Sequence, residues 1–155
     1  MGDWIEAGQA APDFTLEADD GSKVQLSALR GHSVVVYFYP KDDTPGCTRE
    51  ACAFRDRHPK LTEKGVVVLG ISGDSIKSHQ KFKQKYSLNF KLLSDPDHHV
   101  AEQFGAWREK TLYGKKSLGI QRSTFIIAPD GKIQKMWKAV KVDGHDEAVL
   151  EALGA

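Results

Sequence analysis

The chain has 155 residues, of which 40% are hydrophobic and 28% are charged, the usual size and composition of one globular domain with its own core. We therefore expect one domain over residues 1–155. The 22 Lys and Arg residues against 21 Asp and Glu leave a net charge of +1, so the overall field favours neither nucleic acid nor an acidic membrane surface as a partner.

No apolar run approaches the length of a membrane span, and the N-terminus lacks the basic segment followed by an apolar one that marks a secretory signal. We expect a soluble, cytoplasmic protein. Cys47 and Cys52 are the only cysteines, too few for a disulfide-stapled secreted fold and unnecessary for stability in a chain this long. If they matter, they matter as reactive groups.

An N-terminal hairpin is the first predicted element. Residues 14–17 and 23–26 alternate in polarity around the turn residues 19–22, a pattern typical of a hairpin at the edge of a sheet. Residues 33–39, which read SVVVYFY, then form a nearly continuous β-branched and aromatic run, and this predicts a strand covered on both faces. Pro40 ends that strand.

An amphipathic helix follows the loop at residues 41–44. Apolar or small residues recur at three- and four-residue steps, with His58 in the remaining position of the same face; they are Cys47, Ala51, Phe54 and Leu61. Further along, the pattern predicts a buried strand at residues 66–71, a weaker helix at 75–86, a short strand at 91–93 and a brief helix with Val100, Ala101 and Phe104.

The last third predicts a second hairpin, with strands at residues 123–128 and 132–137 around a turn at 129–131, and a final helix at 146–153. Alternating strands and helices followed by a hairpin and a helix predict a central mixed β-sheet flanked by helices. This is the order of a thioredoxin-like α/β fold, here with the N-terminal β-hairpin added.

Cys47 lies in the first turn of the long helix. Thr44 is a good N-cap, Pro45 suits the first helical position, and Gly46 permits close backbone approach. Free amides and the helix dipole at such an end stabilise a thiolate over a thiol, and the thiolate is the nucleophilic form. A plain capped helix that buries a small cysteine would give the same pattern, so position alone leaves both interpretations open.

Cys52 lies five residues after Cys47. On an intact helix the two α-carbons would be roughly 8–9 Å apart on diverging faces. A disulfide needs an α-carbon distance below about 7 Å. Either the two cysteines never pair, or the first turns of the helix open to let them meet.

Zinc binding is a further possibility, since Cys47, Cys52 and His58 are potential ligands. Their spacing fits no common structural zinc pattern, and side chains on one helix cannot converge on a tetrahedron. We therefore expect no metal site. The other histidines are scattered and are interpreted as surface or packing residues; they are His32, His79, His98, His99 and His145.

Pro40, Thr44 and Cys47 reproduce the PxxxTxxC motif of peroxiredoxins within the segment YPKDDTPGCTREACAF. The cysteine five residues later, RSTFII at residues 122–127 and DGKI at 130–133 resemble the peroxiredoxin Q subgroup, also called bacterioferritin comigratory protein. FGAWREKTLYGK at residues 104–115 and GHDEAVL near the end are similar as well, so the resemblance covers essentially the whole chain.

The resemblance implies that Cys47 is the peroxidatic cysteine, which attacks a peroxide oxygen and becomes a sulfenic acid, and that Cys52 is the resolving cysteine. It implies that Thr44 orients the thiolate and the incoming peroxide, and that Pro40 shields the site from bulk water. The resolving cysteine of other subgroups lies near the C-terminus or on a partner subunit, where this chain offers none, so the implied disulfide is within one subunit.

Arg122 corresponds to the family arginine that stabilises the thiolate and the charge on the transferred oxygen. Glu50, one turn after Cys47, matches a position thought to hold that arginine in place, although an exposed glutamate near a helix start would look the same.

The resemblance thus predicts a thiol peroxidase for hydrogen peroxide and organic hydroperoxides, recycled by thioredoxin, with glutaredoxin or glutathione as alternative reductants. It predicts a monomer, with weak dimers allowed, and no metal, haem, flavin or other cofactor. Two alternatives stay open on the same fold. A protein disulfide oxidoreductase would need Cys-x-x-Cys, which this spacing lacks. A redox sensor or holdase would share the reactive and resolving cysteines, but without catalytic turnover.

Overall fold

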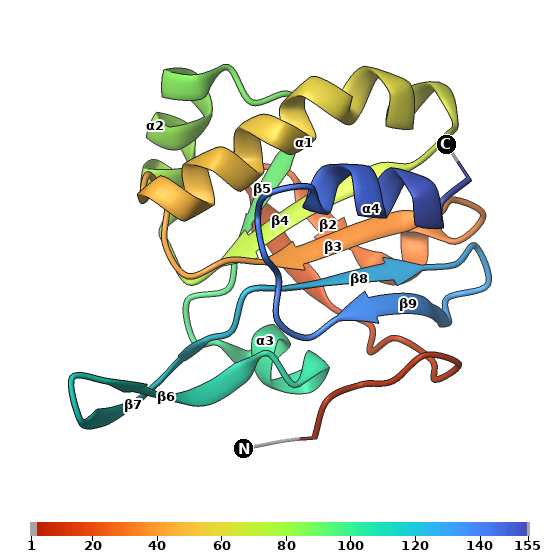
Figure 1. Ribbon diagram of the computed structural model, residues 1–155. Coiled ribbons are helices and arrows are strands. Elements are labelled where there is room, and N and C mark those ends of the chain that lie inside the picture. The colour runs from red at the N-terminus through yellow and green to blue at the C-terminus, as the bar shows by residue number, and fades with distance from the viewer. Residues whose placement is uncertain (1–2, 155) are drawn as a thin grey trace.

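The structure is a computed structural model, and it describes residues 3–154 apart from the side chain of Leu112. A seven-stranded mixed sheet runs through its centre in the order β2-β1-β5-β4-β3-β8-β9 (Figure 1). These strands are β1 (Thr15–Ala18), β2 (Lys23–Gln25), β3 (Val34–Phe38), β4 (Val67–Ser72), β5 (Lys91–Ser94), β8 (Ser123–Ile127) and β9 (Ile133–Trp137).

The middle of the sheet is buried on both faces because β3 is apolar at every position. Val34, Val36 and Phe38 point into one core cluster, while Val35 and Tyr37 point into the other. Strand β3 pairs in parallel with β4 and antiparallel with β8. The carboxyl end of β3, where the chain turns toward the reactive cysteine, therefore lies between two neighbouring strands.

Three helices cover one face of the sheet, and the smaller α3 lies on the other (Figure 1). The helices are α1 (Pro45–Glu63), α2 (Ile76–Tyr86), α3 (His99–Phe104) and α4 (His145–Ala152), and a short 3-10 helix spans Leu26–Leu29. In the described part of the chain, no helix has both the length and the apolar character needed to cross a membrane.

Every strand and helix expected from the sequence is present with ends shifted by a few residues, and the mixed sheet flanked by helices is confirmed. The N-terminal hairpin is also confirmed, with β2 at one edge of the sheet. Three elements were missed, namely the 3-10 helix at Leu26–Leu29 and two strands. Strands β6 (Trp107–Leu112) and β7 (Lys115–Ile120) form a separate two-stranded sheet that projects from the body (Figure 1).

Candidate active site

Cys47 lies in the first turn of α1 and is only 2% exposed. It belongs to the core cluster between the sheet and the helices α1, α2 and α4, beside Tyr37, Tyr39 and Ala51. The backbone amide of Tyr39 donates to the carbonyl oxygen of Ile71 on β4, which extends β3 by one residue. The loop of residues 40–44 then leads directly into α1. The thiol is therefore held at the N-terminal end of a long helix, where the backbone amides favour a negative sulfur.

Arg122 reaches Cys47 from the neighbouring strand. Ser123 pairs with Phe38, so Arg122, one residue before β8, stands beside the end of β3. Its Nη2 donates to Cys47 Sγ at 3.1 Å. A Cβ atom on Gly46 would lie 3.2 Å from the same Nη2, so the glycine leaves room for the guanidinium. The helix end and a fixed cation thus act on one sulfur.

Glu50 holds the other branch of the guanidinium. Arg122 Nη1 donates to Glu50 Oε1 at 2.7 Å, and Glu50 is only 2% exposed. Burial raises the pKa of Glu50 from its ordinary 4.5 to about 7, although the charge and hydrogen bond of Arg122 oppose that shift. The expectation that Glu50 contacts the arginine is met in the geometry, and the alternative of an exposed helix glutamate is wrong.

The positive charge of Arg122 persists despite partial burial. Burial disfavours the charged guanidinium, but the negative charges of Glu50 and Cys47 outweigh it and raise the pKa of Arg122. A second cation lies nearby on β6. Burial lowers the pKa of Lys110, and the charge of Arg122 lowers it further. The side of the site facing β6 is therefore electropositive.

Thr44 and Pro40 lie on the loop that precedes α1. Thr44 occupies the N-cap position with extended backbone angles, but its hydroxyl makes no capping bond to the helix. That hydroxyl instead donates to the carbonyl oxygen of Lys41 at 2.8 Å. The residue is placed as expected, while its side chain stabilises the loop and not the first helical turn. Pro40 is exposed at the end of β3.

Cys52 lies on the same helix as Cys47 and is half-buried, and both thiols are free. The helix is continuous from Pro45 to Glu63, including Pro59, so no break brings the two cysteines together. The structure is that of the reduced protein with the helix intact. His58, the third residue weighed as a zinc ligand, is on this helix and contacts Thr62 and the ring of Phe90.

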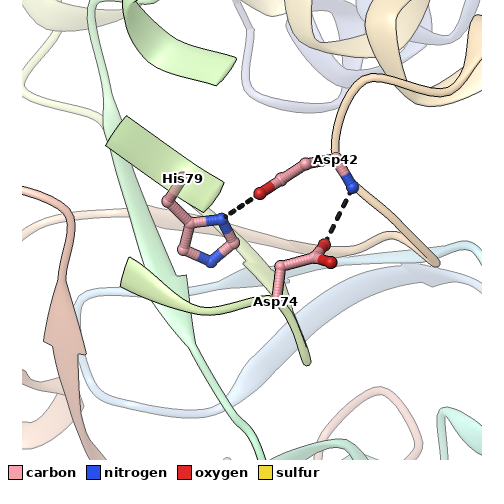
Figure 2. A group of neighbouring side chains, drawn as sticks. All are labelled: Asp42, Asp74 and His79. Atoms are coloured by element: carbon pink, nitrogen blue, oxygen red, sulfur yellow. Dashed lines mark hydrogen bonds and ion pairs between the residues drawn. The ribbon is translucent and has the colours of Figure 1, made fainter. Parts of the chain in front are cut away.

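One polar cluster beside the site was not expected from the sequence. Asp42, Asp74 and His79 place ligand-type atoms within 4.8 Å of one another (Figure 2). His79, interpreted above as a surface or packing residue, is fully buried and bonds to Asp42. His79 lies on the same helix face as Phe82, three residues later, and this spacing could have predicted that the imidazole is buried.

A buried thiol at a helix N-terminus, bonded to an arginine that a buried carboxyl group holds, is an arrangement for a nucleophilic thiolate. The family model described as "AhpC/TSA family" matches residues 7–136. The chain belongs to the AhpC/TSA family. The resemblance to peroxiredoxins inferred from the motif is confirmed.

The curated relatives are themselves named peroxiredoxins. The chain is 57% identical over 150 residues to the putative peroxiredoxin Bcp of Coxiella burnetii, and the match covers 97% of each chain. It is 49% identical over 149 residues to peroxiredoxin Bcp of Bacillus subtilis, covering 96% of this chain and 95% of the relative. The protein is accordingly an enzyme, a thiol peroxidase.

Solved structures agree with this family assignment. A cysteine-to-serine mutant of Xanthomonas campestris peroxiredoxin Q matches with a TM-score of 0.90 and 44% identity, covering 97% of this chain and 96% of that one. A cysteine-to-serine mutant of Xylella fastidiosa PrxQ, changed at a different cysteine, matches with a TM-score of 0.93 and 37% identity, covering 99% of this chain and 98% of that one. These neighbours confirm the thioredoxin-like α/β fold of this peroxiredoxin.

Proposed function

We propose that this peroxiredoxin reduces hydrogen peroxide and organic hydroperoxides with Cys47 as the nucleophile and is recycled by thioredoxin. The observation that carries the proposal is the bond from Arg122 Nη2 to the buried Cys47 sulfur at the start of α1. The bacterioferritin comigratory protein of Xanthomonas campestris, a relative of solved structure, has alkyl peroxide reduction activity, which supports organic hydroperoxides as substrates here.

In the first step the Cys47 thiolate attacks one peroxide oxygen, and the O–O bond breaks as the S–O bond forms. The departing oxygen takes up a proton and leaves as water or as an alcohol, and Cys47 becomes a sulfenic acid. Arg122 stabilises the thiolate before attack and the negative charge that grows on the oxygens during it. In this proposal Thr44 orients the peroxide, and Pro40 covers the site on its solvent side.

In the second step the Cys52 thiol attacks the sulfenic sulfur, water leaves, and a Cys47–Cys52 disulfide forms. Because residues five apart on a helix are too distant for this bond, the first turns of α1 must unwind. Unwinding breaks the ion pair of Glu50 with Arg122 and removes Cys47 from the core. A dithiol reductant then supplies two electrons and restores both thiols by exchange.

The role of Cys52 gives the first prediction. In Cys52→Ser the first oxidation by peroxide should stay within about twofold of the intact chain, because the substitution leaves Cys47, Arg122 and Glu50 in place. Catalytic turnover with thioredoxin, thioredoxin reductase and NADPH should stop, since no disulfide can form. Rapid-mixing and steady-state assays on the same preparation separate the two effects. Full turnover by this variant would contradict the proposed resolving role.

The unwinding is testable on the oxidised protein itself. Hydrogen exchange of the peroxide-treated chain should show that the amides of residues 46–53 lose protection while the rest of α1 keeps it. A Cys47–Cys52 disulfide in which residues 46–53 remain helical would contradict the proposed opening.

Glu50 gives a prediction about pH. Above pH about 7 the ionised carboxylate holds Arg122 by a charge-assisted bond, which Glu50→Gln weakens. The oxidation rate of the variant should match the intact chain well below this pH and fall about fivefold behind it well above, because a charged partner adds roughly 1 kcal/mol to a hydrogen bond. Rates of sulfenic acid formation across the pH range measure the ratio. An equal ratio at every pH would remove Glu50 from the proposed arrangement.

The free energy of unfolding should also depend on the protonation of Glu50. Because burial raises the folded-state pKa of Glu50 above 4.5, the native state binds this proton more tightly than the unfolded chain does. The stabilisation is complete below pH about 4.5 and is lost as the pH rises through about 7. Glu50→Gln should flatten that part of the pH dependence of the free energy of unfolding.

The remaining proposals concern the setting of the enzyme. An intrasubunit disulfide needs no partner chain, which supports a monomer that acts as one domain over residues 1–155, of which residues 1–2 and 155 lie outside the described part. The proposed cycle uses thiols alone and invokes no metal or organic cofactor. Its reductant, whether thioredoxin, glutaredoxin or glutathione, is a cytoplasmic thiol, and we place the enzyme in that compartment.

A further inference from the structure

The loop of residues 40–44, which carries the chain from β3 to Cys47, is tied to helix α2 by two consecutive aspartates. Asp42 is buried and accepts hydrogen bonds from Ser78 at 2.8 Å and from His79, its Nδ1 lying 2.7 Å from Asp42 Oδ2. Asp43 is exposed and has a left-handed φ of 57°. Its carboxylate is 2.8 Å from Lys85 Nζ. The position of the loop is therefore set by α2.

The buried contact between His79 and Asp42 has the geometry of an ion pair. His79 Nε2 lies 2.9 Å from the carbonyl oxygen of Leu93, which only accepts, so this nitrogen carries a proton. Nδ1 lies opposite Asp42 Oδ2, while Asp42 Oδ1 accepts from the Tyr39 hydroxyl at 2.6 Å. A proton on Nδ1 gives Asp42 Oδ2 a charge-assisted donor, and the imidazolium form of His79 is therefore the form that completes this contact.

The surrounding groups agree with a charged imidazole. Burial would lower the pKa of His79, but the hydrogen bond and charge of Asp42 outweigh burial and raise it, with Asp74 adding to the effect. Asp74 also accepts from the backbone amide of Asp42 at 2.8 Å, as Figure 2 shows. On the outer side, Lys77, Lys81 and Lys85 line a hollow of about 480 Å³ with Asp42 and Asp43.

Asp42, Asp74 and His79 are poorly arranged to bind a metal ion. In the imidazolium form of His79 both nitrogens donate to oxygens, so neither offers a lone pair. Asp42 is likewise occupied on both carboxylate oxygens. The cluster is therefore complete as a hydrogen-bonded network.

We infer that Asp42 and His79 are a positioning pair for peroxide reduction, which fixes the loop of residues 40–44 on α2 and so sets where the first turn of α1 presents Cys47 to Arg122. The pair touches neither the reacting sulfur nor the guanidinium. It acts through the four residues between Asp42 and Cys47, among them Thr44. It holds the loop that must stay in place when the turns after it unwind. The inference rests on the proposed role of Cys47.

The expected size of the effect follows from distance. A shift of about 1 Å in a reacting group can cost about 100-fold in rate even when its cause lies away from the chemistry. Neutralising either partner leaves the other without its counter-charge in the core, and the loop then relaxes. His79→Gln and Asp42→Asn should each slow sulfenic acid formation at Cys47 roughly tenfold to 100-fold. The double variant should be no slower than the slower single one, because both remove the same bond.

A pH profile distinguishes positioning from a purely structural role. Since the folded-state pKa of His79 is raised, the ion pair is intact on the acidic side and is lost as the pH rises through that value. The rate of oxidation of folded, intact protein should fall along an alkaline limb that His79→Gln lacks. Glu50→Gln, measured in parallel, should keep this limb. His99→Gln, at the exposed start of α3, is the matched control and should behave like the intact chain.

The experiment measures oxidation rates by rapid mixing with hydrogen peroxide on variants whose folding is verified by circular dichroism. A tenfold or larger loss with removal of the alkaline limb supports the inference. Wild-type rate and wild-type profile in both folded single variants overturn it. If those variants do not fold, Tyr39→Phe and Ser78→Ala provide the test instead. Each removes one hydrogen bond to Asp42 and should slow the oxidation of Cys47 about threefold.

Unchanged rates in both milder variants would also overturn the inference. Failure of the proposed function has a different signature, because in that case Cys47→Ser reacts with peroxide as fast as the intact chain.

Discussion

Cys47→Ser is expected to abolish peroxide consumption, with a loss of several orders of magnitude, because the hydroxyl that replaces the thiol is not ionised near neutral pH. The environment of the residue is otherwise kept, since serine is smaller and the site lies in a helix. The measurement is NADPH oxidation in the presence of thioredoxin and its reductase. The matched variant is Cys52→Ser, which removes the other thiol of the same helix.

The two cysteine variants distinguish between three functions that the chain could have. A peroxidase loses its first oxidation only in Cys47→Ser and loses its turnover in both variants. A redox sensor would oxidise once at Cys47 and would give no turnover even in the intact chain. A protein disulfide oxidoreductase would reduce insulin disulfides and leave peroxide unconsumed. Wild-type turnover by Cys47→Ser would contradict the proposed mechanism outright.

Arg122→Met should lower the rate of Cys47 oxidation by about 10²–10³, the usual cost of removing one donor that stabilises charge in the transition state. Arg122→Lys should restore only part of that rate. The guanidinium uses Nη1 for Glu50 and Nη2 for Cys47, and one ammonium group cannot reproduce this fork. Rapid-mixing oxidation rates measure both variants.

Two controls keep the Arg122 result interpretable. Arg57→Met removes an arginine that pairs with Asp146 and Glu147 on α4, and its oxidation rate should stay within about twofold. Arg122→Met also leaves Glu50 buried without its partner. The double variant Arg122→Met, Glu50→Gln removes that cost, so it should regain stability without regaining rate. A recovered rate in the double variant would show that Arg122 acts through folding alone.

The fold was largely predictable because its central strands carry their own signal. The run at residues 33–39 is apolar at nearly every position, and β3 is buried at every one. Strands β6 and β7 were missed for the opposite reason. Charged residues interrupt both strands, the first four positions of β7 are exposed, and the strands pair with each other outside the main sheet, so no apolar alternation marks them.

The site was predictable from the motif and from helical spacing, but its contacts were not. Glu50 falls on the same helix face as Cys47, Ala51 and Phe54. The helical spacing of these residues therefore predicts that Glu50 is buried, although it is charged. The partner of that carboxyl group, Arg122, is 72 positions away in the chain, and only sheet pairing brings the two together.

The contact between Asp42 and His79 was even harder to predict from the sequence. An aspartate in a charged loop and a histidine in a lysine-rich helix look like surface residues. They form a buried pair because β3 and α2 place them side by side. The spacing of His79 and Phe82 could have predicted the burial of the imidazole, but no local pattern predicts its pairing with Asp42.

Identification of the oxidised sulfur tests the central claim most directly. Cys52→Ser is mixed with one equivalent of hydrogen peroxide in the presence of dimedone, which labels sulfenic acids, and the labelled peptide is located by mass spectrometry. The mechanism predicts a single adduct on Cys47, at a rate that follows peroxide consumption and drops sharply in Arg122→Met. Peroxide consumption with no adduct on Cys47 would contradict the assignment of Cys47 as the peroxide-reducing thiol.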